Sequence, residues 1–319
     1  MVVLVTGASG FLGRYVVQEL LKHNHAVRCL IHTPGMERVF KNQSVDVYYG
    51  DVADVTAMKI ACHDVEFVIS LVSIIRRTKN EDFNTVNIDG VANLMEAVRA
   101  SDSVKHIVHV SALGAIANPR DKYLHSKWKG EQEINKSGIP ATILRPSIIL
   151  GDGDEFSNIM GAAIKILPIL PVIGQGKNRF QPIMVDDMAK CIVAALGRGD
   201  LAGRTIELGG PEQLSYNEIL DLICTTMGKR RLKIHMPFWV IWISVVVLEL
   251  FFNRLPVNRD LIRILIARNV TDLGTAEDTL GISPGFVAQK LDYLRFVGRA
   301  MAFRKILGLK TYGIPSAEV

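Results

Sequence analysis

The sequence predicts an α/β fold with a doubly wound parallel sheet, followed by a smaller C-terminal region that handles a substrate or a partner. Two observations support this class. Short apolar runs alternate with amphipathic helical segments through the first 150 residues, which is typical of parallel strands joined by helical crossovers. The 319 residues are 49% hydrophobic and 22% charged, a globular composition with enough chain for a sizeable core.

The first half gives the clearest pattern. Val2–Thr6 is a continuous apolar run, too short for a helix and typical of a strand buried on both faces. In the next segment Leu12, Val16 and Leu20 recur at helical spacing. On the same reasoning we expect strands at Val2–Thr6, Ala26–Ile31, Val45–Tyr49, Glu66–Leu71, Lys105–Ser111 and Ala141–Arg145, and helices at Phe11–His23, Asp82–Ala100 and Lys122–Lys136.

The second half is less regular. Residues 151–176 look loop-rich, because Pro168 and Pro171 interrupt an apolar run. Helices are expected at Val185–Leu196 and Ser215–Met227, the second with Ser215 and Glu218 at capping-box spacing. Met236–Phe252 is almost entirely apolar.

Charge and cysteine usage limit the classes of function. Lys229 and the residues after it carry 14 Lys and Arg against 7 Asp and Glu, whereas the first 228 residues carry 23 against 25. A basic C-terminal part fits an anionic surface or acidic partner, and equally a solvated basic face. The four cysteines and eight histidines show no ligand spacing, so we expect reduced thiols and no metal site.

A glycine turn after the first strand carries the strongest functional signal. Gly7 allows the tight turn, Gly10 lets the backbone approach a pyrophosphate, and Gly13 permits close helix packing. The helix N-terminus adds free N–H groups and the positive end of its dipole. We therefore expect residues 1–150 to form a Rossmann-type NAD(P)-binding domain completed by about 177–198, with 151–176 and 199–294 as the substrate or partner region and 295–319 as a basic tail.

The end of the second strand bears on the choice of cofactor. An acid there would bind the adenosine ribose and repel a 2′-phosphate, but His32 occupies this region and Glu37 is the first carboxylate after it. Arg14 follows Gly13, and Arg28 is close in sequence. NADP(H) is therefore favoured over NAD(H).

Tyr123 and Lys127 are four residues apart on an expected helix and so share a face. A neighbouring ammonium favours the phenolate and lowers a tyrosine pKa toward the range useful for proton transfer. This pair, one helix after the fifth strand, is the candidate catalytic pair.

These motifs together resemble the extended short-chain dehydrogenase/reductase superfamily. Within it the chain is similar to the atypical group that contains the NADPH-binding accessory subunit of respiratory NADH:ubiquinone oxidoreductase (complex I) and its bacterial relatives. The matching segments are Val5–Gly13, Gly50–Val52, Tyr123–Lys127, Leu144–Ser147, Phe180–Pro182, Val185–Ala189 and Leu208–Pro211 for the superfamily, and Gly10–Val17, Leu170–Gly174 and Leu255–Asp260 for the group.

The resemblance implies a role for each matching residue. The turn Gly7, Ser9, Gly10, Phe11, Leu12 and Gly13 takes the pyrophosphate, with Arg14 beside the adenosine ribose and His32 near it. Asp51 and Val52 flank the adenine, and Leu71, Val72 and Ser73 line the cleft after the fourth strand. Lys127 holds the nicotinamide ribose, Tyr123 is the proton donor, and Pro146 abuts the nicotinamide.

One departure from the superfamily pattern concerns catalysis. Its enzymes place a Ser or Thr hydroxyl just after the fifth strand, but here Ser111 matches the structural serine and Ala112 or Leu113 holds the catalytic position. Losing such a donor costs about 10²–10³ in rate at comparable sites. We therefore expect an NAD(P)(H)-binding protein with low or no turnover. The alternative is an active oxidoreductase or epimerase/dehydratase using Tyr123 and Lys127 on a small hydroxyl, carbonyl or sugar-nucleotide substrate.

The C-terminal part contains a second candidate interaction site. Pro237–Leu248 is uncharged but shorter than the roughly 20 residues a spanning helix needs. Trp239 and Trp242 beside a basic cluster suit a membrane interface, and Arg295–Lys310 repeats this mixture. Core packing explains the segment equally well. We expect a cytoplasmic protein, peripheral on the inner face of the membrane or bound to a membrane complex, with no nucleic-acid partner.

Overall fold

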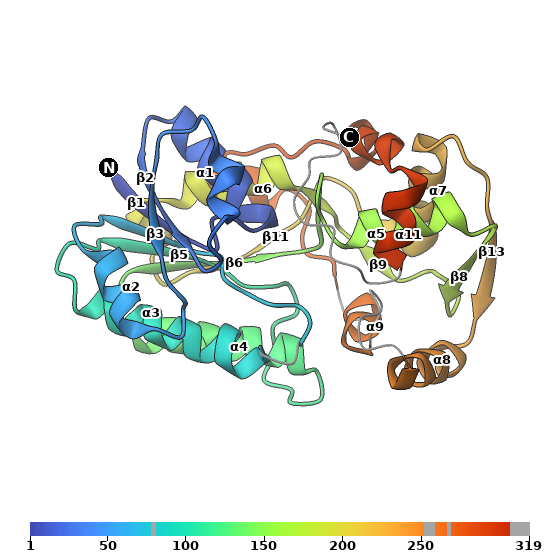
Figure 1. The fold of residues 1–319 in the computed structure, drawn as a ribbon, viewed down its shortest axis with the longest axis horizontal. Coiled ribbons are helices and arrows are strands. Elements are labelled where there is room, and N and C mark those ends of the chain that lie inside the picture. The colour runs from blue at the N-terminus through green and yellow to red at the C-terminus, as the bar shows by residue number, and fades with distance from the viewer. Residues whose placement is uncertain (78–80, 252–258, 267–268, 307–319) are drawn as a thin grey trace. The chain divides into compact units, whose positions relative to one another are not determined.

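The computed structural model describes residues 1–77, 81–251, 259–266 and 269–306 (Figure 1). The chain divides into two compact units. Unit 1 comprises Met1–Pro146, Val185–Leu208 and Gly274–Ser283, and unit 2 comprises Ser147–Met184, Gly209–Leu273 and Pro284–Val319. The expected boundaries need correction. Residues 199–208 and 274–283 were assigned to the substrate or partner region but belong to unit 1, and 147–150 and 177–184 were assigned to the dinucleotide-binding domain but belong to unit 2.

Unit 1 is built on one parallel sheet in the order β3-β2-β1-β4-β5-β6-β11, which confirms the expected doubly wound fold. Six of its strands follow the apolar runs of the sequence, and the seventh, β11, was not expected. The strands are β1 (Val2–Thr6), β2 (Ala26–Ile31), β3 (Val45–Tyr49), β4 (Phe67–Ser70), β5 (His106–Val110), β6 (Ala141–Pro146) and β11 (Thr205–Leu208).

Helices cover both faces of this sheet. In Figure 1, α1 and α6 lie on one face, and α2, α3 and α4 lie on the other. The apolar stripes of the helices and the buried strands, including Leu4, Ile107 and Ile143, form the core of the unit. The helices are α1 (Phe11–Lys22), α2 (Val55–Cys62), α3 (Gly90–Arg99, preceded by a π-helical segment Asn84–Asp89), α4 (Lys122–Lys136), α6 (Val185–Ala195) and α10 (Thr275–Leu280).

Unit 2 combines short strand pairs with helices around a second core. The 151–176 segment is not loop-rich as expected, since it contains α5 and β8. Pro168 follows α5, and Pro171 lies in a strand with one partner, where proline is tolerated. The elements are β7 (Ile149–Leu150), α5 (Phe156–Ile166), β8 (Ile169–Ile173), β9 (Arg179–Phe180), β10 (Ile183–Met184), β12 (Leu214–Ser215), α7 (Tyr216–Thr226), β13 (Leu232–Met236), α8 (Phe238–Phe251), α9 (Arg259–Ile266) and α11 (Arg299–Ile306).

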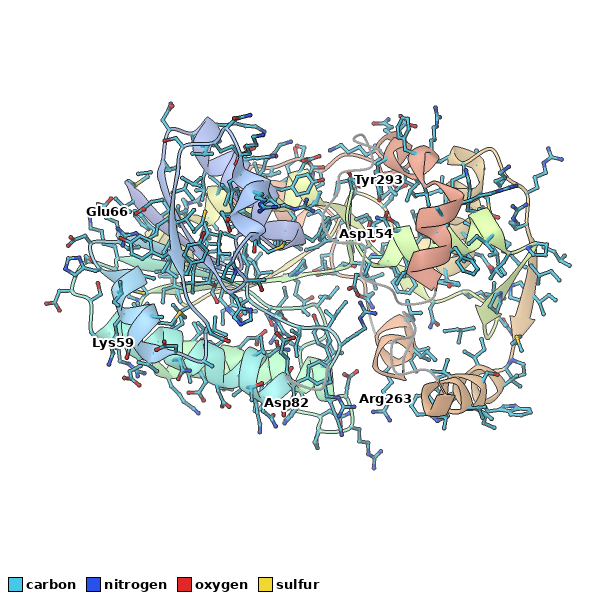
Figure 2. All side chains as sticks on the ribbon, in the orientation of Figure 1. Lys59, Glu66, Asp82, Asp154, Arg263 and Tyr293 are labelled. Atoms are coloured by element: carbon cyan, nitrogen blue, oxygen red, sulfur yellow. The ribbon has the colours of Figure 1, made fainter. Side chains whose placement is uncertain are left out.

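A buried polar cluster fastens the end of the described chain to α5 (Figure 2). The Asp154 carboxylate accepts hydrogen bonds from the Gly151 and Ser157 backbone N–H groups and from the Ser157 and Tyr293 hydroxyls. The Ser157 and Tyr293 hydroxyl oxygens lie 2.7 Å apart. Beyond this point α11 packs against α5, so 299–306 is part of unit 2 and not a separate tail. Residues 307–319 of the expected tail lie outside the described residues.

Candidate functional site

The site expected from the sequence lies at the carboxyl edge of the unit 1 sheet. Strand order reverses between β1 and β4, and such a switch point leaves a crevice outside the strand ends. Thr6 pairs in register with Ser70, Ser70 with His109, and Val110 with Leu144. The loops that follow β1, β4, β5 and β6 therefore leave the sheet at the same edge.

The glycine turn between β1 and α1 has little space for side chains. Gly7 has a φ of +71°, and its backbone carbonyl accepts a hydrogen bond from Gly10 N at 3.0 Å. A Cβ on Gly13 would lie 2.2 Å from Gly7 O and 2.5 Å from Ala8 O, closer than real contacts allow. A Cβ on Gly7 would approach Val72 N at 3.2 Å. Gly7 and Gly13 are thus required by the backbone itself, as the sequence analysis argued.

The N-terminus of α1 is open to an anion. Gly10 is the N-cap with no side-chain cap, and the first turn, which contains Phe11, Leu12 and Gly13, has no acidic residue. Ser9 is half-buried in the turn. The positive end of the helix dipole is therefore not compensated locally. Arg14 follows on this helix, and its buried Nε has no hydrogen-bond partner within the described residues.

The ends of β2 and β3 bring His32 and Asp51 together. His32 Nε2 lies 3.0 Å from Asp51 Oδ2, and both side chains are exposed. The loop after β2 also carries the exposed Arg38, which the sequence analysis did not consider. Arg28 is not an available cation. It binds Asp46 and the carbonyls of Ala61 and His63 and stacks on Tyr48.

Val52, which was expected beside the adenine, is a buried residue packed against Gly90. A Cβ on Gly90 would lie 2.8 Å from the Val52 side chain, so glycine permits this contact. Asn93 Nδ2 donates to Val52 O at 2.9 Å. The segment after β3 is thereby fixed to α3.

Leu71, Val72 and Ser73 continue β4 past its end. Leu71 N donates to Thr6 O, and the buried Ser73 Oγ has no hydrogen-bond partner within the described residues. Asn87 fixes the next residue by exchanging two hydrogen bonds with the backbone of Ile74 and donating a third to Ser126 on α4. Sequence reasoning missed Asn87, which ties the β4 loop to the helix of the candidate catalytic pair.

Lys127 is buried beneath this edge. Its Nζ donates to Val110 O at 2.8 Å, the one hydrogen bond found for it in the described chain. Burial lowers the pKa of Lys127 to about 8, although the charge of Glu131 one turn later acts to raise it. Glu131 itself accepts two hydrogen bonds from Arg145, at 2.8 and 2.6 Å. An ammonium has three donors, so Lys127 keeps two for another acceptor.

Tyr123 differs from the expectation. Lys127 was expected to lower the pKa of Tyr123, whereas burial, with a smaller contribution from the Asp121 charge, raises that pKa above the ordinary value. Lys127 is directed at the Val110 carbonyl, and the Tyr123 ring contacts Phe83. The pair shares a helix as expected, but the phenol is held in its protonated form.

The loop after β5 contains the positions at which the catalytic hydroxyl was expected to be missing. Ala112 and Leu113 occupy the positions directly after Ser111, and Leu113 N donates to Pro146 O at 2.8 Å. Pro146 thus fixes this loop from the end of β6. The Ser111 hydroxyl is buried and has no hydrogen-bond partner within the described residues.

These observations test whether the residues fit a bound dinucleotide. Buried polar groups without partners are uncommon and costly in native proteins. Arg14, Ser73 and Ser111 each have one buried polar atom without a hydrogen-bond partner among the described residues. The buried Lys127 ammonium has N–H groups that donate to no acceptor there. Arg14, Ser73 and Lys127 were assigned to the cofactor or the catalytic site from the sequence, and Ser111 to the structural serine beside it. Their chemistry suits phosphate, hydroxyl and amide groups. The residues fit the cofactor. Among the described residues no group of three or more His, Cys, Asp or Glu could hold a metal ion.

Comparison with known proteins identifies the family. A model of the NAD dependent epimerase/dehydratase family matches residues 3–209. The chain therefore belongs to this family of NAD-dependent proteins, and the expected dinucleotide-binding fold is confirmed.

Relatives with described roles are also similar. The chain is 29% identical to NADH dehydrogenase (ubiquinone) 1 alpha subcomplex subunit 9, mitochondrial, of Arabidopsis thaliana, over 80% of this chain and 65% of that protein. It is 31% identical to ceramide reductase of Caulobacter vibrioides, over 74% of each. The first similarity confirms the resemblance to the complex I accessory subunit group. The chain spans less than two-thirds of that relative's length.

Solved structures share the fold. UDP-glucuronic acid 4-epimerase from Bacillus cereus, in complex with UDP-glucuronic acid and NAD, gives a TM-score of 0.72 at 21% identity, covering 93% of this chain and all of that one. UDP-glucose 4-epimerase from Thermotoga maritima gives 0.73 at 20% identity, covering 96% of this chain and all of that one.

Proposed function

We propose that this protein binds NAD(P)(H) in unit 1 and turns substrate over slowly or not at all. The observation that carries the proposal is the loop after β5, where Ala112 and Leu113 replace the hydroxyl that would polarise a substrate carbonyl. The state of the catalytic pair supports it, because the pKa of Tyr123 is raised and Lys127 donates to the Val110 carbonyl. A neutral phenol can donate a proton, but it is a weak acid without an ammonium beside it.

Each part of the dinucleotide has residues suited to it. The Gly7–Gly13 turn and the α1 N-terminus would hold the pyrophosphate, and Lys127 would donate to the nicotinamide ribose with its two unused N–H groups. Ser73 and Ser111 offer hydroxyls at the ends of β4 and β5. A bound nicotinamide would supply hydride chemistry, and these residues bind and orient it.

We also propose that NADP(H) is preferred to NAD(H). Arg14 and Arg38 can neutralise a 2′-phosphate, and a protonated His32 would add to them. Asp51 opposes this preference, because its carboxylate lies 3.0 Å from His32. The measurement is calorimetric titration with NADPH and NADH. Asp51→Asn should increase the ratio of the two affinities and Arg38→Ala should decrease it, and an equal affinity of the native protein for both cofactors would contradict the proposal.

The second candidate is an active reductase or epimerase. Ceramide reductase, the relative from Caulobacter vibrioides, acts by its name on a lipid carbonyl or alcohol, so a lipid substrate is the leading alternative class. The unpaired Ser111 hydroxyl favours this candidate, since it could serve in place of the missing one.

The test separates holding the cofactor from using it. Tyr123→Phe should leave NADPH affinity within about twofold, because a proton donor acts only in the transition state. Lys127→Ala should weaken it about tenfold or more through loss of charge-assisted hydrogen bonds. Rapid cofactor oxidation with a long-chain keto-lipid or a sugar nucleotide, abolished by Tyr123→Phe, would overturn the low-turnover proposal.

We further propose that the protein associates peripherally with a membrane surface or a membrane complex, on the cytoplasmic side. The similarity to a subunit of mitochondrial NADH dehydrogenase supports association with a membrane complex, and the basic, apolar C-terminal part supports association with a membrane surface. Within the described residues no helix combines the length and the apolar character needed to cross a membrane. Fractionation of cell lysates at low and high salt tests the association, which predicts partial release by salt. Recovery of the protein entirely in the soluble fraction at low salt would contradict it.

A further inference from the structure

Strand β13 of unit 2 has its polar residues on the inner face and its apolar residues on the outer face, the reverse of an ordinary surface strand. It pairs in parallel with β8, in the register Leu232↔Ile169, Lys233↔Leu170, Ile234↔Pro171 and His235↔Val172. Leu170 and Val172 are buried in the core of unit 2, so the face they share with Lys233 and His235 is the inner one.

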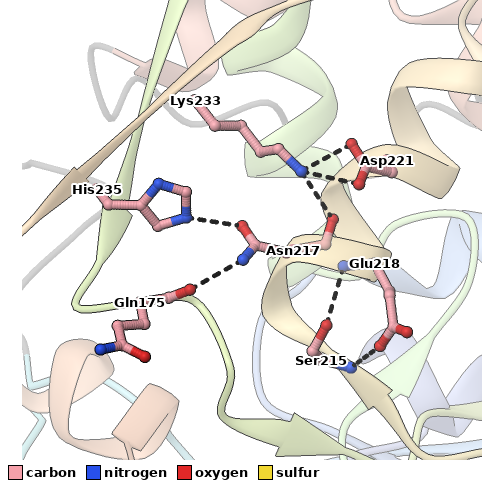
Figure 3. Close-up of polar contacts among 7 residues, drawn as sticks. All are labelled: Gln175, Ser215, Asn217, Glu218, Asp221, Lys233 and His235. Atoms are coloured by element: carbon pink, nitrogen blue, oxygen red, sulfur yellow. Dashed lines mark hydrogen bonds and ion pairs between the residues drawn. The ribbon is translucent and has the colours of Figure 1, made fainter.

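Polar contacts hold this inner face to α7 (Figure 3). Lys233 Nζ lies 2.8 Å from both Asp221 oxygens, and His235 Nε2 lies 3.3 Å from Asn217 Oδ1. Asn217 Nδ2 also donates to Gln175 O at the end of β8. Polar contacts to α7 thus hold Lys233 and His235 on this face, with Lys233 half-buried and His235 exposed.

The opposite face of the strand pair is apolar and exposed. Leu232 is 63% exposed and its partner across the pair, Ile169, is 43% exposed. Ile234 is also 43% exposed. Surface strands ordinarily place such residues inside and their polar residues outside. This arrangement needs a cover that is itself apolar.

Helix α8, which follows after Pro237, continues the apolar surface. All its residues except Ser244 and Glu249 are apolar, yet among Phe238–Val247 only Val245 is buried. A helix that is apolar all round is normally buried in a core or in lipid. Its 14 residues give about 21 Å, short of the roughly 30 Å bilayer core.

The exposed apolar residues of α8 lie along one side of the helix. At about 100° per residue, Phe238, Trp239, Ile243 and Val247 cover roughly half of its circumference. Lys229 and Arg230, exposed just before β13, have no ion pair within the described residues. Cations just before an exposed aliphatic strand, followed by a helix with an exposed tryptophan, have the composition of segments at the boundary between anionic headgroups and acyl chains.

We propose that the outer face of β13 and helix α8 together insert into one leaflet of an anionic lipid bilayer, with Lys229 and Arg230 at the headgroups. This deepens the proposed peripheral association by committing it to lipid. The two exposed cations favour lipid over an apolar protein groove, because anionic headgroups supply the complementary charge beside the acyl chains. The length of α8 limits it to one leaflet, as in monotopic proteins.

The test uses the full-length protein and vesicles of phosphatidylcholine with or without phosphatidylglycerol. The protein should float with the anionic vesicles and bind the neutral ones more weakly. High salt should release only part of it, since the apolar contribution is not screened. Brominated lipids should quench Trp239 and Trp242 but leave Trp128, which lies in α4 of unit 1.

Paired variants locate the inserted surface. Leu232→Ser with Ile234→Ser, and separately Trp239→Ser with Ile243→Ser, should each lower the vesicle partition coefficient about tenfold or more. Ile60→Ser removes an equally exposed apolar residue from α2 of unit 1 and should change nothing. Lys229→Glu with Arg230→Glu should weaken binding to anionic vesicles only, and Lys41→Glu serves as its control.

Nucleotide affinity measured on the same samples separates this inference from the proposed function. Variants that lose vesicle binding should keep their NADPH affinity, which also shows that they are folded. No flotation with anionic vesicles would overturn the inference. So would flotation unaffected by the two apolar pairs, or a dimer in light scattering that the Leu232→Ser, Ile234→Ser variant dissociates, which would assign the surface to self-association. Flotation without nucleotide binding would refute the dinucleotide proposal alone.

Discussion

Replacing Lys127 with methionine should stabilise the protein without cofactor while weakening cofactor binding. Lys127 is 3% exposed and donates to Val110 O, and burial lowers its pKa from 10.5 to about 8. The folded protein therefore holds the ammonium less favourably than the unfolded chain does. Methionine is similar in length and carries no charge.

The size of the effect follows from the pKa shift. About 2.5 pKa units correspond to roughly 3 kcal/mol at a pH below both values. Losing the hydrogen bond to Val110 costs about 1 kcal/mol. Lys127→Met should therefore raise the free energy of unfolding by about 2 kcal/mol at pH 7. Because the folded-state pKa is the lower one, the cost of the ammonium is complete below pH about 8 and disappears above pH about 10.5. The advantage of the variant should fade across that interval.

Urea unfolding between pH 7 and pH 10.5, followed by circular dichroism without nucleotide, measures the difference. Lys59→Met is the matched control, since Lys59 pairs with Glu96 on the surface and should change stability by less than about 0.5 kcal/mol. Calorimetry with NADPH should show a loss of about tenfold or more for Lys127→Met alone. A variant that is less stable than the native protein at pH 7, or a difference independent of pH, would refute the reasoning.

Three further substitutions test other contacts. Gly13→Ala should weaken NADPH binding by more than about tenfold in calorimetry, because its Cβ would overlap backbone oxygens at 2.2 and 2.5 Å. Gly199→Ala, with open space around it, should leave affinity unchanged. Ser215→Ala removes one side of a capping box and should lower the free energy of unfolding by about 1 kcal/mol in urea melts. Tyr293→Phe leaves Asp154 with one donor fewer and should cost about 1–3 kcal/mol in the same assay, and an unchanged midpoint would show that this cluster contributes nothing.

The core of unit 1 could be predicted because its signals are local. Val2–Thr6 is apolar and bounded by a glycine turn, and that turn is specified by backbone contacts that only glycine permits. The same local reasoning missed β11, whose run Thr205–Leu208 is short and interrupted by Glu207. Its place in the sheet comes from pairing with β6, a contact between segments about 60 residues apart that no local pattern reveals.

The candidate site also combines features that local sequence spacing predicts with features that only the tertiary structure determines. Gly7, Gly13 and Lys127 could be named from spacing, since spacing fixes which residues share a turn or a helix face. The electrostatics could not, because the burial of Tyr123 and the contact of Lys127 with the Val110 carbonyl are set by tertiary packing. Arg28 was misjudged for this reason. Its position in the sequence says nothing of the carbonyls of Ala61 and His63, which bind it in the fold.

The two units are each destabilised by a different kind of unsatisfied group, and the two binding proposals concern these two kinds of group. In unit 1, Ser73, Ser111 and Lys127 hold buried polar groups that lack full partners among the described residues, at about 1–3 kcal/mol for each unsatisfied group. In unit 2, Leu232 and Trp239 hold apolar side chains in water, and burying each would return about 1.5–3 kcal/mol. A polar ligand can satisfy the buried polar groups of unit 1 but cannot cover the exposed apolar side chains of unit 2. Lipid can cover those apolar side chains but cannot satisfy the polar groups. Binding of dinucleotide and binding of bilayer should therefore each raise the stability of the protein, and each should do so through its own set of residues.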